Sequence, residues 1–360
     1  MRVLLVAEQL RRRVPGGIGT YVRGLLSGLS RLDPEPADHQ TDLTLWASRG
    51  PRPDPLAGCG RALIASRLPG PLLTRGWDLG LLRAPTGFSV VHAPSLAAPP
   101  TRGSPLVVTV HDLAWRQLPD AYPPRGRRWH DGALARALRT ARLFVVPSRP
   151  AADALVAAGA AAGRVEVVEE GSDHLPPPDQ AAAAALLESL AVPGPYLLAV
   201  GTLEPRKNLA RLLDAYSRAR SRLPEPWPLV VVGPQGWGGS LTAVDGALLA
   251  GAVDPPVLAA LYAGARCLAY VPLLEGFGLP PVEAMRAGTP VLASPMPSTG
   301  GAALEVDPED VDAMVAGLLT VAGDDATRDE LVRAGTQRVA GLTWSSTARR
   351  HIELWKAVAG

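Results

Sequence analysis

Two glutamates flank a loop rich in glycine and proline, and their spacing suits the recognition of sugar hydroxyls. Residues 275–283 read Glu-Gly-Phe-Gly-Leu-Pro-Pro-Val-Glu, so Glu275 and Glu283 lie eight positions apart. Pro280 and Pro281 predict a helix start, because prolines there lack only N–H groups that have no intrahelical acceptor anyway. The positive end of this helix would lie between the two carboxylates and attract an anion. We therefore predict a diphosphate at the helix start, with each carboxylate accepting hydrogen bonds from a hydroxyl group.

A turn followed by a surface helix is the alternative interpretation, and a second loop argues against it. Residues 196–200 form an apolar run typical of a buried strand, and residues 201–208 read Gly-Thr-Leu-Glu-Pro-Arg-Lys-Asn before leucines at helical spacing. Arg206 and Lys207 would thus lie at a helix N-terminus, where cations oppose the helix dipole unless an anion joins them. Lys207 is informative because the chain has one other lysine, Lys356, against 34 arginines. A structural Arg-Lys pair at a solvated helix start remains open.

Short apolar segments alternate with helical segments along the chain, which predicts an α/β protein with parallel, doubly wound sheets. We expect strands at 2–7, 42–47, 90–93, 105–111, 143–147, 165–169, 196–200, 228–232, 247–251, 267–271 and 290–293. We expect helices at 18–31, 71–83, 126–141, 149–158, 309–322, 325–340 and 345–358. The proline-rich residues 176–195 interrupt the alternation and predict a linker. It would separate an N-terminal domain, 1–175, from a C-terminal domain, 196–343, and a last helix at 344–360.

Further residues of interest lie at predicted strand ends, where ligands bind in sheets of this kind. Gly16 and Gly17 follow the first strand, although such a pair alone is more typical of a plain turn. His111 ends the strand at 105–111, and Asp112 after it is placed to orient the ring. A lone histidine there can also be structural, and His92 at another strand end is the less favoured alternative. We expect two facing sheets whose strand-end loops line a cleft between the domains.

As a set, these segments resemble the retaining glycosyltransferases of family 4, which have the two-domain GT-B architecture. The resemblance covers nearly the whole chain and rests on strand-end loops at 15–19, 110–113, 146–148, 170–173, 201–208 and 275–283. It implies two facing Rossmann-like domains, of which the first binds the acceptor and the second binds a nucleotide sugar. It also implies a C-terminal helix that crosses back to the first domain, which would let Trp344 and Trp355 pack across the hinge.

The resemblance assigns roles to individual residues. Its catalytic positions correspond to His111, Glu275, Arg206 and Lys207. Its donor-binding positions correspond to Gly16, Gly17, Thr202, Gly276, Phe277, Gly278, Leu279 and Glu283. Glu275 would hold hydroxyls of the donor sugar and Glu283 the ribose. Arg206, Lys207 and N–H groups of the loop would stabilise the charge that develops on the β-phosphate as the glycosidic bond breaks.

The branch with His-Asp-Leu and Glu-Pro-Arg-Lys-Asn is similar to bacterial mannosyltransferases of lipid-linked or envelope glycans. The expected donor is therefore GDP-mannose, with no metal or other cofactor required. A UDP-sugar-dependent enzyme and a non-catalytic sugar-nucleotide-binding subunit are the alternatives. A glycosidase also uses two carboxylates, but it has no use for an Arg-Lys loop.

Three features depart from the family pattern or stay open. Thr202 occupies a position where many relatives have arginine, and Arg206 would take over its phosphate contact. Residues 240–251 and 295–302 look shortened. Residues 233–237 are expected to form one wall of the base pocket, without a residue that tells guanine from uracil.

Composition limits the cellular setting. No stretch approaches the ~20 uninterrupted apolar residues that a membrane-spanning helix needs. The N-terminus reads as a strand and not as a signal peptide, so we expect a cytoplasmic protein. Cys59 and Cys267 lack a partner pattern, which argues against a disulfide framework or a zinc site.

Charge is divided unevenly along the chain. Residues 1–175 carry 22 Lys and Arg against 15 Asp and Glu, whereas the remainder carries 14 against 19. Six arginines cluster in one predicted helical region, at Arg125, Arg127, Arg128, Arg136, Arg139 and Arg142. Such a helix can lie on the anionic inner face of the plasma membrane or hold a lipid-phosphate acceptor, and a solvated arginine face is an equal alternative. No nucleic-acid-binding pattern accompanies the charge.

Overall fold

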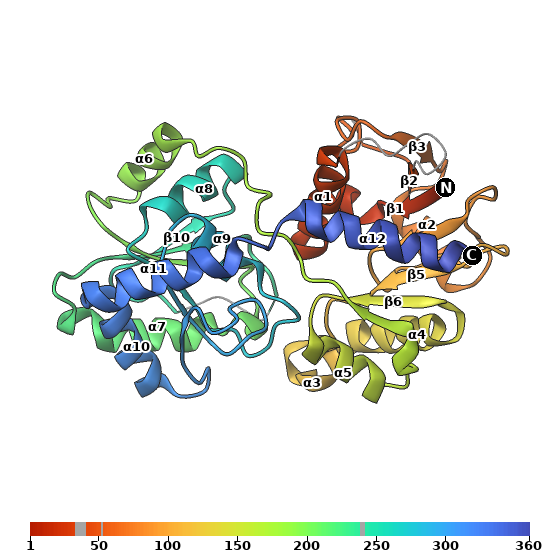
Figure 1. The fold of residues 1–360 in the computed structure, drawn as a ribbon. Helices are drawn as coiled ribbons and strands as arrows, with labels where there is room; N and C mark the ends of the chain where they lie inside the picture. Colours follow the sequence, from red (N-terminus) through yellow and green to blue (C-terminus); the bar gives the residue numbers. More distant parts are fainter. Residues whose placement is uncertain (33–40, 52, 238–241) are drawn as a thin grey trace. The chain divides into compact units, whose positions relative to one another are not determined.

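The computed structural model of the chain describes residues 1–32, 41–51, 53–237 and 242–360 (Figure 1). The chain divides into two compact units. The first comprises Met1–His174 together with Thr343–Gly360, and the second comprises Leu175–Leu342. The segment 240–251, noted above as short, begins outside the described residues.

The first unit is built on a parallel sheet of seven strands in the order β3-β2-β1-β4-β5-β6-β7. The strands are β1 (Arg2–Val6), β2 (Asp42–Ala47), β3 (Ala62–Ala65), β4 (Val90–Ala93), β5 (Leu106–Thr109), β6 (Leu143–Val146) and β7 (Val165–Val167). Every residue of β4, β5 and β6 is buried, because the central strands of a parallel sheet are covered on both faces. All six strands predicted here are present, and β3 is an additional edge strand whose residues are mostly exposed.

Helices of the first unit follow the strand ends. They are α1 (Gly16–Arg31), α2 (Gly70–Asp78), α3 (Ala114–Gln117), α4 (Pro124–Thr140), α5 (Arg149–Ala157) and α12 (Trp344–Ala359). The start of α5 shows how a strand-end motif works locally. Ser148 is its N-cap, and the Ser148 hydroxyl accepts a hydrogen bond from the Ala151 N–H, which would otherwise lack an acceptor.

The last helix, α12, packs against α1 inside the first unit, as the expected return of the chain requires (Figure 1). A β-carbon added at Gly24 of α1 would lie 2.1 Å from a ring atom of Trp344, and one at Gly28 would lie 2.0 Å from the Trp344 carbonyl oxygen. Glycine at these two positions is what allows the helices to approach so closely. Trp344 and Trp355 are both fully buried, and both lie in the first unit.

The second unit has a parallel sheet of six strands in the order β10-β9-β8-β11-β12-β13. The strands are β8 (Leu197–Val200), β9 (Leu229–Val232), β10 (Ala247–Gly251), β11 (Cys267–Tyr270), β12 (Val291–Ala293) and β13 (Leu304–Glu305). The helices are α6 (Gln180–Ser189), α7 (Leu209–Ala219), α8 (Pro255–Gly264), α9 (Leu279–Arg286), α10 (Val311–Gly323) and α11 (Asp325–Val339). All five predicted strands are present, and the two-residue β13 extends the sheet at one edge.

Residues 176–195, expected as a linker, belong to the second unit. Asp179 caps α6 by accepting a hydrogen bond from the Ala182 N–H. Ala183 is buried in the core of this unit, in the same cluster as Val192 and Tyr196. The alanine-rich helix therefore has an apolar partner surface, which a free linker would lack.

Both sheets reverse their strand order next to the first strand of the unit, between β1 and β4 in the first unit and between β8 and β11 in the second. At such a switch point the chain leaves the two neighbouring strands toward opposite faces, so the loops diverge and leave room for a ligand. The loops after β1, β4, β8 and β11 are therefore where a site is expected.

Candidate functional site

Hydrogen bonds join the loops that follow β8 and β11 at the switch point of the second unit. Asn208 has a left-handed backbone (φ 58°), which asparagine tolerates better than most residues. Its Nδ2 donates to the carbonyl oxygens of Val271 (3.0 Å) and Pro308 (2.7 Å). The Leu273 N–H donates to the Arg206 carbonyl oxygen at 2.9 Å. These bonds fix the short 3-10 helix η5 (Pro205–Lys207) against the loop after β11.

Two cations and two carboxylates meet in these loops. Lys207 Nζ donates to Glu275 Oε1 at 2.5 Å, and the Tyr270 hydroxyl donates to the same oxygen at 2.9 Å. Arg206 reaches Glu275 Oε1 and Glu204 Oε1, each at 3.0 Å. None of the four charged side chains is more than 14% exposed. The structure therefore brings three predicted catalytic residues together and adds Tyr270 and Glu204, for which the sequence analysis predicted no chemical role.

The cluster holds its groups in defined protonation states. Burial alone would raise the pKa of Glu275, but the charges of Arg206 and Lys207 outweigh it and lower that pKa to about 2. Burial raises the pKa of Glu204, against the opposing charge of Arg206. Burial and the charge of Glu275 hold the pKa of Tyr270 well above its usual value. Glu275 is therefore a carboxylate that accepts hydrogen bonds, and too weak a base to abstract protons efficiently near neutral pH.

The loop after β11 ends at Gly278, whose backbone lies in the left-handed region (φ 99°). A β-carbon at Gly278 would lie 2.5 Å from Met296 Sδ and 2.9 Å from Ser298 Oγ, so both the conformation and the space require glycine. Helix α9 then begins at Leu279 with prolines in its first turn, as the sequence predicts. Pro280 and Pro281 have no N–H groups, so Gly278 and Leu279 supply the backbone donors at this helix start. The N-cap Gly278 has no side chain that could bond them, which leaves these donors and the positive end of the helix dipole as the features of an anion site.

Other predicted donor-binding residues lie in the same two loops and in α9. Phe277 is 4% exposed and packs in the core, so its ring anchors the loop instead of facing a ligand. Glu283 is 7% exposed, and its Oε2 accepts a hydrogen bond from the Tyr262 hydroxyl at 2.7 Å. Thr202 is half-buried in the loop after β8, and Gly276 is buried in the loop after β11. A ribose at Glu283 would thus meet a carboxylate that Tyr262 already orients.

In the first unit, His111 follows β5 and faces an acceptor at each ring nitrogen. Its Nδ1 lies 3.2 Å from Glu170 Oε1, and its Nε2 lies 3.0 Å from the Pro94 carbonyl oxygen. Burial lowers the pKa of His111, but the hydrogen bond and charge of Glu170 outweigh burial and raise it above its usual value. Because a carboxylate and a carbonyl only accept, these two partners stabilise the doubly protonated ring, the imidazolium, in line with the raised pKa of His111. Asp112 does not orient the ring as expected, because its Oδ1 accepts from the Ala114 N–H at 3.0 Å.

Gly16 and Gly17 form the first turn of α1 and are both exposed. No atom of the described residues outside the immediate helix backbone lies within 4 Å of the place where either would carry a β-carbon, so this helix start is open among them. Tyr21, farther along α1, contacts the His111 ring with centroids 4.9 Å apart. The glycine turn and His111 therefore belong to one edge of the first sheet.

The alternative histidine, His92, is fully buried in β4 and bonded through Nε2 to Thr109 Oγ1 at 2.8 Å. Burial, together with nearby histidines, holds the pKa of His92 well below its usual value. His92 is therefore part of the core. The remaining predicted residues form two groups, one in each unit: Gly16, Gly17 and His111 in the first, and Thr202, Arg206, Lys207, Glu275 and the start of α9 in the second.

Comparison with known proteins identifies the family. A model described as "Glycosyltransferase Family 4" matches residues 15–174, and one described as "Glycosyl transferases group 1" matches residues 194–333. The O-antigen chain mannosyltransferase B of Escherichia coli is 30% identical over 283 residues, which are 74% of this chain and 74% of that protein. The chain belongs to glycosyltransferase family 4.

Further relatives of this family 4 glycosyltransferase are similar over part or all of their length. The phosphatidyl-myo-inositol mannosyltransferase of Mycobacterium tuberculosis (strain ATCC 25618 / H37Rv) is 33% identical over 207 residues, which are 51% of this chain and 52% of that protein. Sucrose-phosphate synthase from Thermosynechococcus elongatus has a TM-score of 0.75 at 21% identity, covering 99% of both chains. Anabaena HepE in complex with UDP and glucose has a TM-score of 0.72 at 18% identity, covering 99% of this chain and 100% of that one. The predicted GT-B fold is confirmed.

We predict that Glu275 makes the stability of the glycosyltransferase sensitive to acid. Its pKa is about 2 in the folded protein against an ordinary 4.5, so the ionised carboxylate stabilises the fold at neutral pH. This contribution, on the order of 3 kcal/mol, is lost as the pH falls from about 4.5 toward 2. Chemical denaturation of wild type and Glu275→Gln measures it, because other carboxylates titrate in both proteins. The difference in unfolding free energy should shrink across this range, and a constant difference would contradict the assignment.

Proposed function

We propose that this glycosyltransferase moves a hexose, mannose from GDP-mannose, to a hydroxyl of a glycan or lipid-linked acceptor in cell-envelope or polysaccharide biosynthesis. The transfer would retain the configuration of the anomeric carbon. The observation that carries the proposal is the largely buried cluster of Arg206, Lys207 and Glu275 at the switch point of the second sheet. The two relatives above that are named mannosyltransferases support mannose as the sugar. The complex of HepE with UDP and glucose keeps a UDP-sugar as the alternative donor.

The leaving group determines how the cluster would work. In the free protein, Arg206 and Lys207 are paired with Glu275, and Arg206 is also paired with Glu204. A donor diphosphate carries two negative charges or more, and we infer that it takes these cations over from Glu275. Charge-assisted hydrogen bonds from Lys207 and Arg206 would then stabilise the charge on the β-phosphate as it develops. Glu275 would be released to accept hydrogen bonds from hydroxyls of the donor sugar.

The surrounding elements supply the other donor contacts. The start of α9 offers backbone N–H groups at Gly278 and Leu279 and the positive end of its dipole. Glu283 would accept from the ribose. Residues 233–237 would form a wall of the base pocket, in which Trp237 is 41% exposed and can stack on a base. In the first unit, the Nε2–H of His111 would exchange the Pro94 carbonyl oxygen for a hydroxyl oxygen of the donor sugar.

The same cluster supports transfer with retention and without a metal. Arg206 and Lys207 would give the diphosphate the charge compensation that a divalent cation gives elsewhere. Once the cations are bound to the diphosphate, the Tyr270 hydroxyl and hydroxyls of the donor sugar would donate to Glu275, which makes the carboxylate a weak nucleophile. This favours attack of the acceptor hydroxyl on the face of the leaving phosphate over a covalent glycosyl-enzyme.

Calorimetric titration with GDP-mannose, UDP-glucose and UDP-N-acetylglucosamine, first with EDTA and then with Mg²⁺, tests the donor assignment. We expect selective binding of GDP-mannose under both conditions. Lys207→Ala should weaken it about 10- to 100-fold, because a hydrogen bond to a charged group contributes about 1.5–3 kcal/mol. Arg218→Ala, which removes an exposed ion pair with Asp214 on α7, is the matched control and should bind normally.

Each other outcome changes a different part of the proposal. Selective binding of a UDP-sugar would replace the donor and keep the site. Binding that requires Mg²⁺ would contradict transfer without a metal. Failure of folded wild type to bind any of the three would contradict the mannosyl-donor assignment and favour a donor outside this set or a non-catalytic subunit that binds a glycan.

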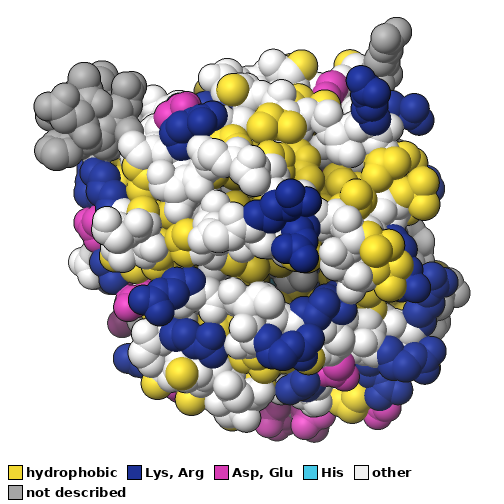
Figure 2. All heavy atoms as spheres, turned by 90° about the vertical axis from the view of Figure 1, so that its right-hand side faces the viewer, with side chains coloured by type: hydrophobic (Ala, Val, Ile, Leu, Met, Phe, Trp, Pro, Cys, Tyr) yellow, Lys and Arg dark blue, Asp and Glu magenta, His cyan; other side chains and the backbone are white. Residues whose placement is uncertain are grey.

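We further propose that the acceptor side contacts an anionic membrane through a surface of α2 and α4, here called the basic surface. One hollow on it is lined by Arg75, Arg125, Arg128, Arg136 and Trp129, among others. Leu72, Leu79 and Leu81 nearby in the sequence are 57%, 54% and 75% exposed. Figure 2 shows Lys and Arg side chains mixed with hydrophobic ones over one face of the molecule. In the part of the chain that the structure describes, no helix has the length and apolar character to cross a membrane.

Vesicle flotation tests the basic surface. Wild type should float with vesicles containing phosphatidylglycerol and stay behind with pure phosphatidylcholine. The double reversal Arg125→Glu with Arg128→Glu should reduce flotation at least tenfold, because each basic residue near the surface contributes about 1 kcal/mol. Arg333→Glu, an exposed arginine of α11 in the second unit, is the control. Equal flotation of the double variant and wild type would refute the contact.

A further inference from the structure

A buried chain of polar side chains connects the last helix of the first unit with the strand ends of its sheet. It contains Tyr21 of α1, His92 of β4, Thr109 of β5 and His351 of α12. The Tyr21 hydroxyl lies 2.7 Å from His351 Nε2 and 3.0 Å from Thr109 Oγ1, which in turn lies 2.8 Å from His92 Nε2. None of the four residues is more than 1% exposed. The family resemblance assigns no role to any of them.

The partners fix the direction of every hydrogen bond in this chain. His351 Nδ1 lies 2.7 Å from the Thr347 carbonyl oxygen, which only accepts, so Nδ1 carries the proton. Burial lowers the pKa of His351 to about 4, so the ring is neutral and Nε2 must accept from the Tyr21 hydroxyl. Tyr21 has no second proton, so Thr109 donates to Tyr21 and His92 Nε2 donates to Thr109. A single proton arrangement therefore accounts for every hydrogen bond of the chain, and among the described residues it leaves the buried Nδ1 of His92 without a partner.

Tyr21 connects this hydrogen-bonded chain to His111 through a contact between the two aromatic rings. The ring of His111 turns only about its Cα–Cβ and Cβ–Cγ bonds, and in the free protein Glu170 and the Pro94 carbonyl oxygen hold its two nitrogens. A donor sugar bound at Nε2 would replace the Pro94 contact, so the ring then depends on Glu170 and on its aromatic neighbour. The ring of Tyr21 meets that of His111 edge to face, with an interplanar angle of 85° and centroids 4.9 Å apart. This third contact limits the rotation, because an aromatic ring packed at this distance blocks other tilts.

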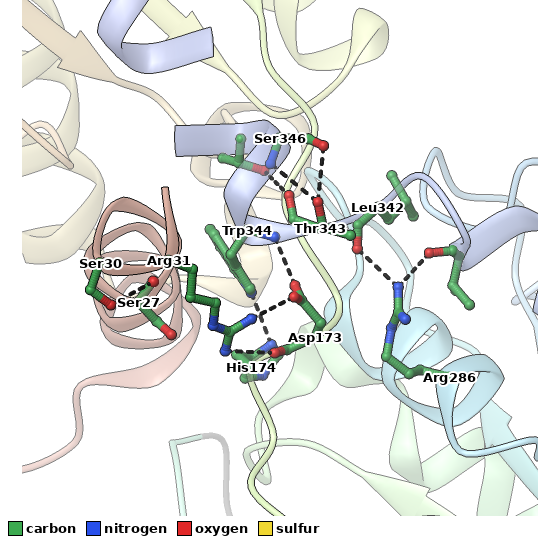
Figure 3. Close-up of polar contacts among 12 residues, drawn as sticks. Ser27, Ser30, Arg31, Asp173, His174, Arg286, Leu342, Thr343, Trp344 and Ser346 are labelled. Carbon is green, nitrogen blue, oxygen red and sulfur yellow. Dashed lines mark hydrogen bonds and ion pairs between the residues drawn. The ribbon is translucent and has the colours of Figure 1, made fainter. Parts of the chain in front are cut away.

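His351 in turn depends on how α12 is seated. The Trp344 N–H donates to Asp173 Oδ1 at 2.7 Å, and the indole N–H donates to His174 Nδ1 at 3.2 Å (Figure 3). Arg31 of α1 holds the other oxygen of Asp173 at 2.6 Å. With Trp344 fixed and close against Gly24, the helix can present His351 to Tyr21 in one register.

We propose that Tyr21 and His351 are positioning residues for His111, so that the docked C-terminal helix sets the plane of the imidazolium ring. The proposal rests on the proposed function, in which His111 contacts the donor sugar. It adds a role for α12, the C-terminal helix with which the chain returns to the first unit. This helix is required for the geometry of the site and not only for the stability of the fold.

The test compares Tyr21→Phe and His351→Leu with wild type by NMR of protein labelled with ¹³C at histidine Cε1, the His111 signal being assigned by His111→Gln. Phenylalanine keeps the aromatic ring but not the hydroxyl, so a shift or broadening of the His111 signal means that the ring has moved. We expect this change in both variants, and a smaller one in His351→Gln, which keeps an acceptor for Tyr21. An unchanged His111 signal in folded Tyr21→Phe and His351→Leu would overturn the proposal.

Activity provides the second readout. Tyr21→Phe should lower kcat about tenfold and leave the donor KM within twofold, and in a His111→Ala background it should cost less than twofold. Costs that add fully in the double variant would mean that Tyr21 does not act through His111. Tyr196→Phe removes a hydroxyl bonded to the Leu261 carbonyl oxygen in the second unit and is the control for loss of a buried hydrogen bond. If His111→Ala is fully active, the proposed role of His111 fails, whereas the NMR comparison still decides whether Tyr21 positions its ring.

Discussion

The buried pairing of Lys207 and Arg206 with Glu275 is the interaction on which the second unit's site depends. Two cations next to each other in partly buried loops repel one another, and leaving a buried charge without its partner costs several kcal/mol. Glu275 compensates both, and Tyr270 adds a third donor to the same oxygen. The loops after β8 and β11 therefore keep one arrangement without a ligand. In the proposed function, a diphosphate entering this place would find cations already positioned, and the carboxylate that it displaces would bind hydroxyls of the sugar.

The first unit also pairs a basic side chain with a carboxylate at a strand end, but here the basic group is an imidazole instead of two permanently charged side chains. The buried carboxylate of Glu170 raises the pKa of His111 at a strand end and pairs with its ring, as Glu275 pairs with Lys207 in the second unit. The groups that connect α12 to His111 are uncharged. They form hydrogen bonds of fixed direction that reach Tyr21, whose ring contacts that of His111. In each unit, a cation at the carboxyl edge of a parallel sheet is held by groups that follow other strands or helices. Fold and site geometry thus depend on the same contacts.

Local patterns made much of the fold predictable. Continuous apolar runs marked the central strands, and Pro280 and Pro281 marked the start of α9. The edge strands β3 and β13 were missed because they are short and their residues are not fully buried. The alanine-rich helix α6 was interpreted as part of a linker because its partners come from elsewhere in the unit.

Motifs also located Arg206, Lys207, Glu275 and His111, but they did not identify the side chains that bind these residues. Tyr270 lies 63 positions from Lys207, and Glu170 lies 59 from His111. The strand-end motif that begins at Glu170 was the one available signal for it.

In the proposed function, a diphosphate replaces Glu275 as the partner of Lys207. The test of this exchange compares the affinity of wild type and Glu275→Gln at neutral pH for GDP, the product nucleotide without the sugar. If Glu275 holds the cations that the diphosphate takes over, removing its charge removes a competitor. We therefore expect GDP to bind Glu275→Gln several-fold more tightly than wild type, although the variant turns over more slowly. Weaker or equal binding of GDP by a folded Glu275→Gln variant would contradict the exchange and, with it, the proposed role of the cluster.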